Sequence, residues 1–481
     1  MKRLSLLPLL LVSCASAPVA PPAPCGVLPT QRQLAWHDRE FYAFVHFNMN
    51  TFTGVEWGHG GEPAETFRPT ALDCEQWCEL FAECGLTGVI LTAKHHDGFC
   101  LWPSAFTEHD VESTSWRDGR GDVLADLAAA CRKYGLFLGV YLSPWDQNNP
   151  VYGRDDAAYN DVFAGQLAEV LTNYGEVAEV WWDGANGDRD DPEKHQEYDW
   201  PRFIEVVRRL QPGAVIFSDD GPDVRWVGNE RGTAAETQWS TMFPPRNGAL
   251  VSPGDDDPSP DVLNTGEEGG TRWLPAESDV SIRPGWYWTP DTDERVKSAR
   301  ELLDIWYASV GRNTNLLLNF PVDARGLVHE NDAAALREMA DVLRATFRRD
   351  LALGKPAKAS SVRGDSPRFA AARVNDGDSD SYWATADDVV TGTVTIDLGG
   401  PTTFDRALLQ EHVELGQRVR AWRLEARVGG AWRVAAEGTT IGHKRIVRFP
   451  ALRADAVRLE VLDSRACPTI ERIGLFDAPD E

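Results

Sequence analysis

An apolar run that stops on a carboxylate is the clearest sign of chemistry in this sequence. Residues 180–182 (Val-Trp-Trp) have the composition of a buried strand, and Asp183 and Gly184 follow directly. A carboxylate is not left unpaired in an apolar core, and a glycine lets the chain turn without crowding a ligand. No helix is predicted to begin nearby, which disfavours a helix-capping role. We therefore expect Asp183 at the mouth of a site, where it could act as a nucleophile.

Acid–base chemistry at such a site needs a second carboxyl group with a different pKa. Glu230 lies on a predicted loop after Asp219, and loops can bring acids 47 positions apart (230 minus 183) across one pocket. An apolar lid or the charge of Asp183 would raise the pKa of this second acid. Glu236 is the alternative. The sequence favours Glu230 without separating the two.

Polar residues also follow several other apolar runs. They are His46, His95, His96, Asp97, Ser143, Asp219 and Asn319. In a parallel barrel the carboxyl ends of the strands meet at one face, and polar residues gathered there are typical of a catalytic face. The pattern therefore predicts a barrel whose site lies at that face.

Alternating elements support this architecture. Short apolar strands alternate with amphipathic helices from Phe41 to about Leu351, with helices predicted at residues 72–84, 123–134, 161–174, 201–210, 294–310 and 331–349. The alternation predicts an α/β fold with a (β/α)8 TIM-like barrel. The segment 219–289 is rich in Pro, Gly, Asp and Trp. We expect it to form long loops over the barrel mouth, with weak strands near Trp226 and Trp286.

The pattern changes after Leu353. Helical periodicity gives way to short alternating runs with frequent turns, which is typical of an all-β sandwich. We therefore divide the chain into a leader with an Ala/Pro tether (residues 1–25), a catalytic barrel (26–352) and a β-sandwich (353–481).

Composition limits the classes of partner. The chain has 481 residues and a formal net charge of −26, so nucleic acid and anionic membrane surfaces would be repelled. A neutral ligand would not sense this charge. The 18 tryptophans suit apolar packing and the faces of sugar rings. The sequence leaves the oligomeric state open.

The first residues resemble an export signal. A basic start (1–3) precedes an apolar core (4–12) that is too short to span a membrane as a helix. The core ends in a lipobox-like Leu-Val-Ser-Cys sequence, which predicts lipidation of Cys14 and anchoring in the bacterial envelope, at the periplasm or outer membrane. The alternative is cleavage near Ala15 or Ala17 and secretion. If Cys14 is lipidated, the lipid anchor would be the only contact with a membrane.

Metal ligands are not arranged in any common pattern. The seven other cysteines form no CxxC pair, and there is no His-x-His or Glu-x-x-His spacing. His95 and His96 would point to opposite faces of a strand unless the strand has already turned into a loop. We expect buried thiols and no cofactor for catalysis.

Several stretches together resemble a known family. They are residues 44–47 (Phe-Val-His-Phe), 56–58 (Glu-Trp-Gly), 94–99 (Lys-His-His-Asp-Gly-Phe), 180–184, 226–230 (Trp-Val-Gly-Asn-Glu) and 309–313 (Ser-Val-Gly-Arg-Asn). From about Gln33 to Arg349 the chain resembles the α-L-fucosidases of glycoside hydrolase family 29. The 226–230 sequence is similar to the branch that acts on α-1,3/1,4-linked fucose in Lewis-type glycans.

The resemblance implies a retaining exo-α-L-fucosidase working by covalent double displacement. Such an enzyme uses one ionised carboxylate as nucleophile and one protonated carboxyl as acid, about 5 to 5.5 Å apart. Asp183 is the implied nucleophile and Glu230 the implied general acid/base, with Glu236 as the alternative.

The resemblance also implies a set of residues that hold the fucose. They are His46, Glu56, Trp57, His95, His96, Tyr141, Arg225 and Trp286. A neutral pocket rich in His, Tyr and Trp offers donors, acceptors and apolar walls to a deoxy sugar.

The C-terminal region resembles the discoidin-like carbohydrate-binding modules that often accompany glycosidases. In such modules an Asp-rich loop and a late glutamate can hold a structural calcium ion, which would be bound here by Asp376, Asp380 and Glu471. An Asx-type turn without a metal is an equal alternative.

Three alternative functions stay open beside the leading hypothesis. One is a broad-specificity α-L-fucosidase, and another is a non-catalytic, lectin-like fucose-binding protein. The third is a related glycosidase such as a galactosidase. Under the leading hypothesis and the first two alternatives, the expected partner is a fucosylated oligosaccharide or glycoconjugate.

Overall fold

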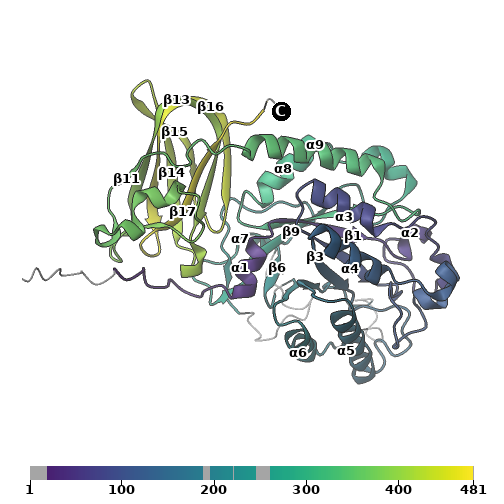
Figure 1. The fold of residues 1–481 in the computed structure, drawn as a ribbon. Helices are drawn as coiled ribbons and strands as arrows, with labels where there is room; N and C mark the ends of the chain where they lie inside the picture. Colours follow the sequence, from purple (N-terminus) through teal and green to yellow (C-terminus); the bar gives the residue numbers. More distant parts are fainter. Residues whose placement is uncertain (1–18, 188–194, 220, 245–259, 480–481) are drawn as a thin grey trace, which may run out of the picture.

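A closed barrel and an antiparallel β domain make up the molecule (Figure 1). This computed structural model describes residues 19–187, 195–219, 221–244 and 260–479. The fold class predicted from the sequence is confirmed. Cys14 and most of the predicted leader lie outside the described residues.

Eight parallel strands close the barrel in the order β1-β10-β9-β6-β5-β4-β3-β2. They are β1 (Phe41–His46), β2 (Gly88–Lys94), β3 (Phe137–Leu142), β4 (Glu179–Trp181), β5 (Val215–Ser218), β6 (Val224–Trp226), β9 (Ala276–Ser281) and β10 (Asn315–Pro321). Both faces of such strands are covered, which explains why most of them read as continuous apolar runs.

The helices are α1 (Gln31–His37), α2 (Asn50–Thr53), α3 (Cys74–Glu83), α4 (Val123–Tyr134), α5 (Asp156–Asn173), α6 (Trp200–Leu210), α7 (Pro260–Thr265), α8 (Ala299–Ser309) and α9 (Glu330–Phe347). Capping residues set their ends. Asp122 caps α4, which has the predicted bounds. Asp155 caps α5, which therefore begins earlier than the predicted residue 161. Ser298 and Glu301 form a capping box, so α8 begins later than the predicted residue 294.

The segment 219–289 holds more regular structure than predicted. It contributes two barrel strands, β6 and β9, and a small antiparallel pair, β7 (Thr241–Met242) and β8 (Arg272–Trp273). The weak strand predicted near Trp226 is β6, whereas Trp286 lies outside any strand. β9 reads as polar (Ala-Glu-Ser-Asp-Val-Ser) although all six residues are buried. Hydrogen bonds satisfy its acids, which is why hydrophobicity did not reveal the strand.

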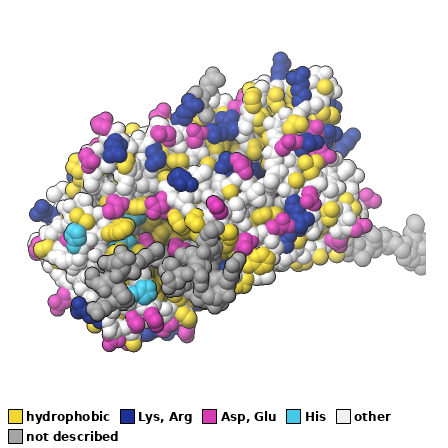
Figure 2. Space-filling model, turned by 180° about the vertical axis from the view of Figure 1, so that it is seen from behind, with side chains coloured by type: hydrophobic (Ala, Val, Ile, Leu, Met, Phe, Trp, Pro, Cys, Tyr) yellow, Lys and Arg dark blue, Asp and Glu magenta, His cyan; other side chains and the backbone are white. Residues whose placement is uncertain are grey.

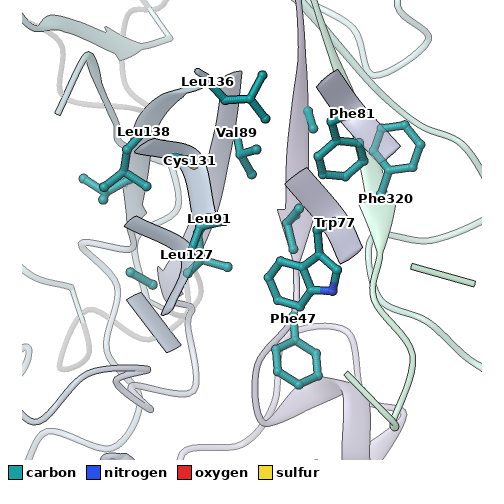
Figure 3. Packing of buried hydrophobic residues seen from close by; sticks show 14 of the residues in the cluster. Phe47, Trp77, Phe81, Val89, Leu91, Leu127, Cys131, Leu136, Leu138 and Phe320 are labelled. Carbon is teal, nitrogen blue, oxygen red and sulfur yellow. The ribbon is translucent and has the colours of Figure 1, made fainter. Parts of the chain in front are cut away.

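Helices α3 and α4 pack on the barrel through an aromatic and aliphatic core (Figure 3). Trp77 of α3 is fully buried; its ring centroid is 5.9 Å from that of Phe47, and its indole donates to the Gly326 carbonyl at 3.0 Å. Phe81 packs on Phe320 of β10, with centroids 4.8 Å apart. These contacts fix the outer helical layer against β1, β2 and β10.

The C-terminal domain is an antiparallel sheet in the order β12-β17-β13-β16-β14-β15, with β11 paired to β13. Its strands are β11 (Ala357–Ala359), β12 (Trp383–Ala384), β13 (Gly392–Glu411), β14 (Val419–Val428), β15 (Ala431–Gly438), β16 (Arg445–Ser464) and β17 (Thr469–Phe476). Register shifts interrupt the pairing of the long strands β13 and β16. A separate core, which includes Trp383 and Trp422, fills the domain.

Acidic and basic side chains are interspersed on the surface seen in Figure 2. Among the described residues, none of the helices is both long and apolar enough to cross a bilayer. Of the seven described cysteines, Cys25 is half-buried and the others are buried as free thiols, as expected.

Candidate active site

A cavity of about 1050 Å³ opens at the carboxyl ends of the barrel strands. Nine of the predicted site residues line it, namely His46, Glu56, Trp57, His95, His96, Tyr141, Asp183, Glu230 and Trp286. They come from the ends of β1, β2, β3 and β4 and from loops after β1, β6 and β9. Of the residues chosen by the strand-end rule, His46, His95, His96 and Asp183 line this cavity, whereas Asp97, Ser143, Asp219 and Asn319 do not.

Asp183 lies two residues beyond the end of β4 and is held from two sides. The Tyr141 hydroxyl donates to its Oδ2 at 3.1 Å, and the backbone N–H of Ala185 donates to its Oδ1 at 2.7 Å. A Cβ atom at Gly184 would lie 2.2 Å from an Asp219 carboxylate oxygen, so a larger residue here would require the Asp219 side chain to move. The hydrogen bonds stabilise an ionised carboxylate in a fixed orientation, as a nucleophile requires.

Glu230 lies on the loop after β6, at the edge of the same cavity. Partial desolvation raises the pKa of its carboxyl, and the charge of Asp183 raises this pKa further. A hydrogen bond with Trp286 acts in the opposite direction. Burial and the charge of Asp183 thus favour the protonated form of Glu230 in this cavity.

The three histidines at the strand ends are neutral. Burial lowers the pKa of His46 to about 3, although its hydrogen bond to Asn319 opposes the shift. Burial also lowers the pKa of His95 and of His96. Neutral imidazoles keep cationic charge away from the carboxyl groups and can either donate or accept hydrogen bonds.

His96 shows how the tautomer is set. Its Nδ1 lies 2.8 Å from Ser143 Oγ, and the Ser143 hydroxyl donates to the Trp145 carbonyl at 2.7 Å. Because the Ser143 hydroxyl donates its proton to Trp145, its oxygen can only accept from His96. His96 Nδ1 must therefore carry a proton. Its Nε2 is left as an acceptor, 3.9 Å from Asp183 Oδ2 and facing the cavity.

His95 and His96 both reach the cavity because β2 ends at Lys94, before them. Their ring centroids are 4.1 Å apart. The chain has therefore already turned into a loop, which was the condition for both side chains to share one site. In the described ranges, however, no three His, Cys, Asp or Glu side chains are grouped so that they could hold a metal ion.

Two predicted residues are placed elsewhere. Arg225 is fully buried and does not line the cavity; its guanidinium donates to the carbonyls of Leu263 and Leu274 and to Gln238 Oε1. From β6 its side chain extends to the segments that contain Leu263 and Leu274 and not into the cavity. The Glu236 side chain is 73 % exposed and pairs with Arg312 and Arg445. The structure therefore separates the two candidate acids and brings only Glu230 to Asp183.

The candidate calcium ligands have protein partners in this structure. Asp376 accepts a hydrogen bond from Ser381 and pairs with Arg373 at 3.1 Å. Glu471 lies 3.5 Å from His412 Nδ1. Over the described residues, no three His, Cys, Asp or Glu side chains are grouped so that they could hold a metal ion, and calcium binding stays a prediction.

Acids that the sequence did not reveal stand behind the site. Glu277 of β9 is fully buried and accepts hydrogen bonds from Tyr42 and, at 2.8 Å, from the Trp181 indole. Burial raises the pKa of Glu277 and, together with the charge of Glu277, that of Glu179. Both shifts favour the protonated forms of these acids. Trp181 in turn stacks on Tyr141, whose hydroxyl donates to Asp183, with ring centroids 5.3 Å apart.

Asp279 is a further acid, and it lines the cavity itself. It accepts a hydrogen bond from the Trp226 indole at 2.8 Å. Burial, and to a lesser extent the charge of Glu230, raises the pKa of Asp279 well above its usual range. The outer wall also includes Trp145, Tyr152 and Arg154. Trp145 follows Ser143 at the end of β3, so the strand-end rule could have found it.

Comparison with known proteins agrees with this geometry. The sequence pattern described as Alpha-L-fucosidase matches residues 29–346, more than half of the chain. This chain belongs to the α-L-fucosidase family. The pattern described as F5/8 type C domain matches residues 356–473, in the C-terminal β domain. The protein is therefore a glycoside hydrolase with a discoidin-like module.

Individual relatives cover nearly the whole fucosidase. An Arabidopsis thaliana protein named Alpha-L-fucosidase 1 is 42 % identical over 467 residues, which are 96 % of this chain and 90 % of that protein. The crystal structure of SpGH29 shares 38 % identity with a TM-score of 0.89 and covers 96 % of this chain and 100 % of that one. A Ruminococcus gnavus GH29 fucosidase in complex with fucose shares 32 % identity with a TM-score of 0.87, over 96 % of this chain and 97 % of that one.

The coupling between the two cavity acids can be measured directly. Since burial is the main cause of the raised Glu230 pKa and the Asp183 charge the next, Asp183→Asn should lower that pKa while leaving it above its ordinary value. Carbon-13 NMR of the labelled glutamate carboxyls across a pH series gives the pKa, with Glu230→Gln to assign the resonance. Glu56→Gln should lower it less, because Glu56 is the weaker contributor. An unchanged pKa in Asp183→Asn would show that the two acids do not interact.

Proposed function

We propose that this α-L-fucosidase is a retaining exo-enzyme that releases terminal α-1,3/1,4-linked L-fucose from Lewis-type oligosaccharides or glycans. The proposal rests chiefly on one observation. Asp183, fixed by Tyr141, shares a cavity with Glu230, whose pKa is raised in part by the charge of Asp183. An ionised and a protonated carboxyl at one cavity are what a double displacement needs.

In the first step, Asp183 attacks the anomeric carbon and the bond from that carbon to the glycosidic oxygen breaks. Glu230 gives its proton to the departing oxygen, which leaves as a hydroxyl group, and the fucosyl group is bonded to Asp183. In the second step, Glu230 takes a proton from water while the water oxygen attacks the anomeric carbon. This frees Asp183 and returns Glu230 to its protonated form, with the anomeric configuration retained.

The walls of the cavity suit a neutral deoxy sugar. Neutral His46, His95 and His96 offer hydrogen bonds to ring hydroxyls, and Trp286 with Phe44 offers an apolar surface for the methyl group. A cavity of about 1050 Å³ is at the upper end of ordinary ligand pockets, so it has room for the sugars that carry the fucose.

The nucleophile can be tested by chemical rescue. Asp183→Gly should lose turnover by at least roughly a thousandfold, because no covalent intermediate can form. Added azide fits the vacated space and should restore fucose transfer, with β-L-fucosyl azide as the product identified by NMR. Asp183→Asn serves as the folding control, with thermal unfolding close to that of the wild type. Full activity in either variant, or an α-azide product from Asp183→Gly, would contradict the assignment.

Substrate preference is tested with a panel on the wild-type enzyme. We expect free fucose from Lewis a and Lewis x trisaccharides and much less from 2'-fucosyllactose or an aryl fucoside, as measured by chromatography. Similar rates on all four would favour the broad-specificity alternative, and binding without release would favour a lectin. An α-L-galactoside, which carries a hydroxyl on the fucose methyl, should react roughly a hundredfold more slowly because that hydroxyl meets an apolar wall.

We propose that the chain is exported and anchored through a lipid on Cys14. The support is the basic start, the short apolar core and the Leu-Val-Ser-Cys sequence at residues 11–14. In a bacterial host, fucosidase activity should sediment with membranes for the wild type and become soluble for Cys14→Ser. Soluble activity in both would favour cleavage near Ala15 or Ala17 and secretion.

A further inference from the structure

The loop that carries Glu230 lies between the two domains. It leaves the barrel after β6 and runs from about residue 227 to residue 240. Its first half is attached to the barrel, since the Ala234 N–H donates to the Ala308 carbonyl and Arg312 donates to the Ala234 carbonyl, both at 2.8 Å. Its second half has partners in both domains. The barrel side binds Trp239, whose N–H donates to the Thr265 carbonyl and whose carbonyl accepts from Arg225. The C-terminal domain supplies the partners of the Gln238 and Ser240 N–H groups.

Side chains of the C-terminal domain satisfy the backbone of that second half. Thr440 Oγ1 accepts from the Gln238 N–H at 2.9 Å. Gln417 accepts from the Ser240 N–H and donates to the Gln238 carbonyl, both at 2.8 Å. Thr440 and Gln417 are almost fully buried. Buried backbone groups need partners, so these contacts fix the path of the loop.

Arg445, at the start of β16, supplies the charged contact. It is buried to 2 % exposure and donates to the Glu236 carbonyl, and it also pairs with the Glu236 carboxylate at 3.3 Å. Arg312 of the barrel pairs with the same carboxylate. Glu236 is therefore held by one arginine from each domain, six residues beyond Glu230.

A buried carboxylate fixes the part of the C-terminal domain that contacts the loop. Glu411 of β13 is buried and accepts hydrogen bonds from the backbone N–H groups of Arg418, Val419 and Gly442 at 2.7 to 2.9 Å. These bonds tie the segment that carries Gln417 to the segment that carries Thr440. The His443 N–H also donates to Asn313 of the barrel at 2.7 Å.

We infer that the C-terminal domain is a positioning element for the general acid/base. Thr440, Gln417 and Arg445 are positioning residues that hold residues 236–240 so that Glu230 stays over the cavity. They act through the loop and touch neither substrate nor Glu230. The inference rests on the proposed role of Glu230. It assigns the C-terminal domain a part in the reaction that is separate from any binding of sugar.

Leaving-group dependence distinguishes this role from simple stabilisation. The sugar that departs from a fucosyl oligosaccharide is a poorly acidic alcohol, so its departure needs the proton from Glu230. Fluoride departs from α-L-fucosyl fluoride with far less need of that proton. The ratio kcat/KM reports the first chemical step. A misplaced acid therefore lowers kcat/KM on the oligosaccharide and spares the fluoride, while a general loss of structure lowers both.

The experiment uses the full chain and compares Thr440→Val, which preserves volume, with Arg445→Met. Each should lose roughly 10- to 100-fold in kcat/KM on the Lewis trisaccharide and less than about threefold on the fluoride. Thr440→Ser keeps the hydroxyl and should behave as the wild type. Arg448→Met removes another contact of β16 with the barrel, an ion pair with Asp304 at 2.6 Å, and should leave both substrates unaffected.

Equal losses on both substrates in Thr440→Val, or no loss in either variant, would overturn the inference. Glu230→Ala is the reference that separates it from the proposed function. If Glu230→Ala lacks the selective loss on the trisaccharide, the acid/base assignment itself fails. If Glu230→Ala shows it and Thr440→Val does not, only the positioning role fails.

Discussion

Two carboxyl groups must hold different protonation states around one partly desolvated cavity, and much of this structure follows from that requirement. Asp183 accepts hydrogen bonds from Tyr141 and the Ala185 backbone. Burial and the charge of Asp183 raise the pKa of Glu230. A cationic histidine nearby would lower the pKa of Glu230. The burial of His46 and His95 keeps them neutral and so preserves the difference.

Tyr141, whose hydroxyl donates to Asp183, is itself held in place by neighbouring residues. Tyr141 stacks on Trp181, and Trp181 lies flat on Phe217, with centroids 4.1 Å apart. The Trp181 indole donates to Glu277, and burial raises the pKa of Glu277 and of the neighbouring Glu179. Burying two acids in a barrel interior is costly unless they are neutralised and hydrogen-bonded. These buried acids lie next to the aromatic residues that orient Tyr141, and the orientation of groups at the site matters most for catalysis.

Local signals in the sequence predicted the barrel and part of the cavity, whereas Glu56, Trp57, Tyr141 and Trp286 came from the family resemblance. Apolar strands that end in polar residues pointed to His46, His96 and Asp183, and caps such as Asp122 agreed with helical periodicity. β9 was missed because its buried acids gain partners only from distant strands. Arg225 was assigned to the sugar through the family resemblance, although it is occupied by backbone carbonyls behind the cavity. Long-range hydrogen bonds of this kind leave no mark on local periodicity.

The two acids also differ in how firmly their backbone is fixed. Asp183 follows a barrel strand, where the ladder on both sides determines its position. Glu230 follows β6, which is as short as β4, but it lies four residues beyond the strand end, on a loop whose ordering costs conformational entropy at every residue. The barrel supplies partners for the first half of that loop through Ala308 and Arg312 and for Trp239 through Thr265, but the N–H groups of Gln238 and Ser240 find their acceptors in the C-terminal domain. A barrel without this domain would leave those groups to water. The fusion of the two domains therefore has a physical reason that lies in the geometry of the site.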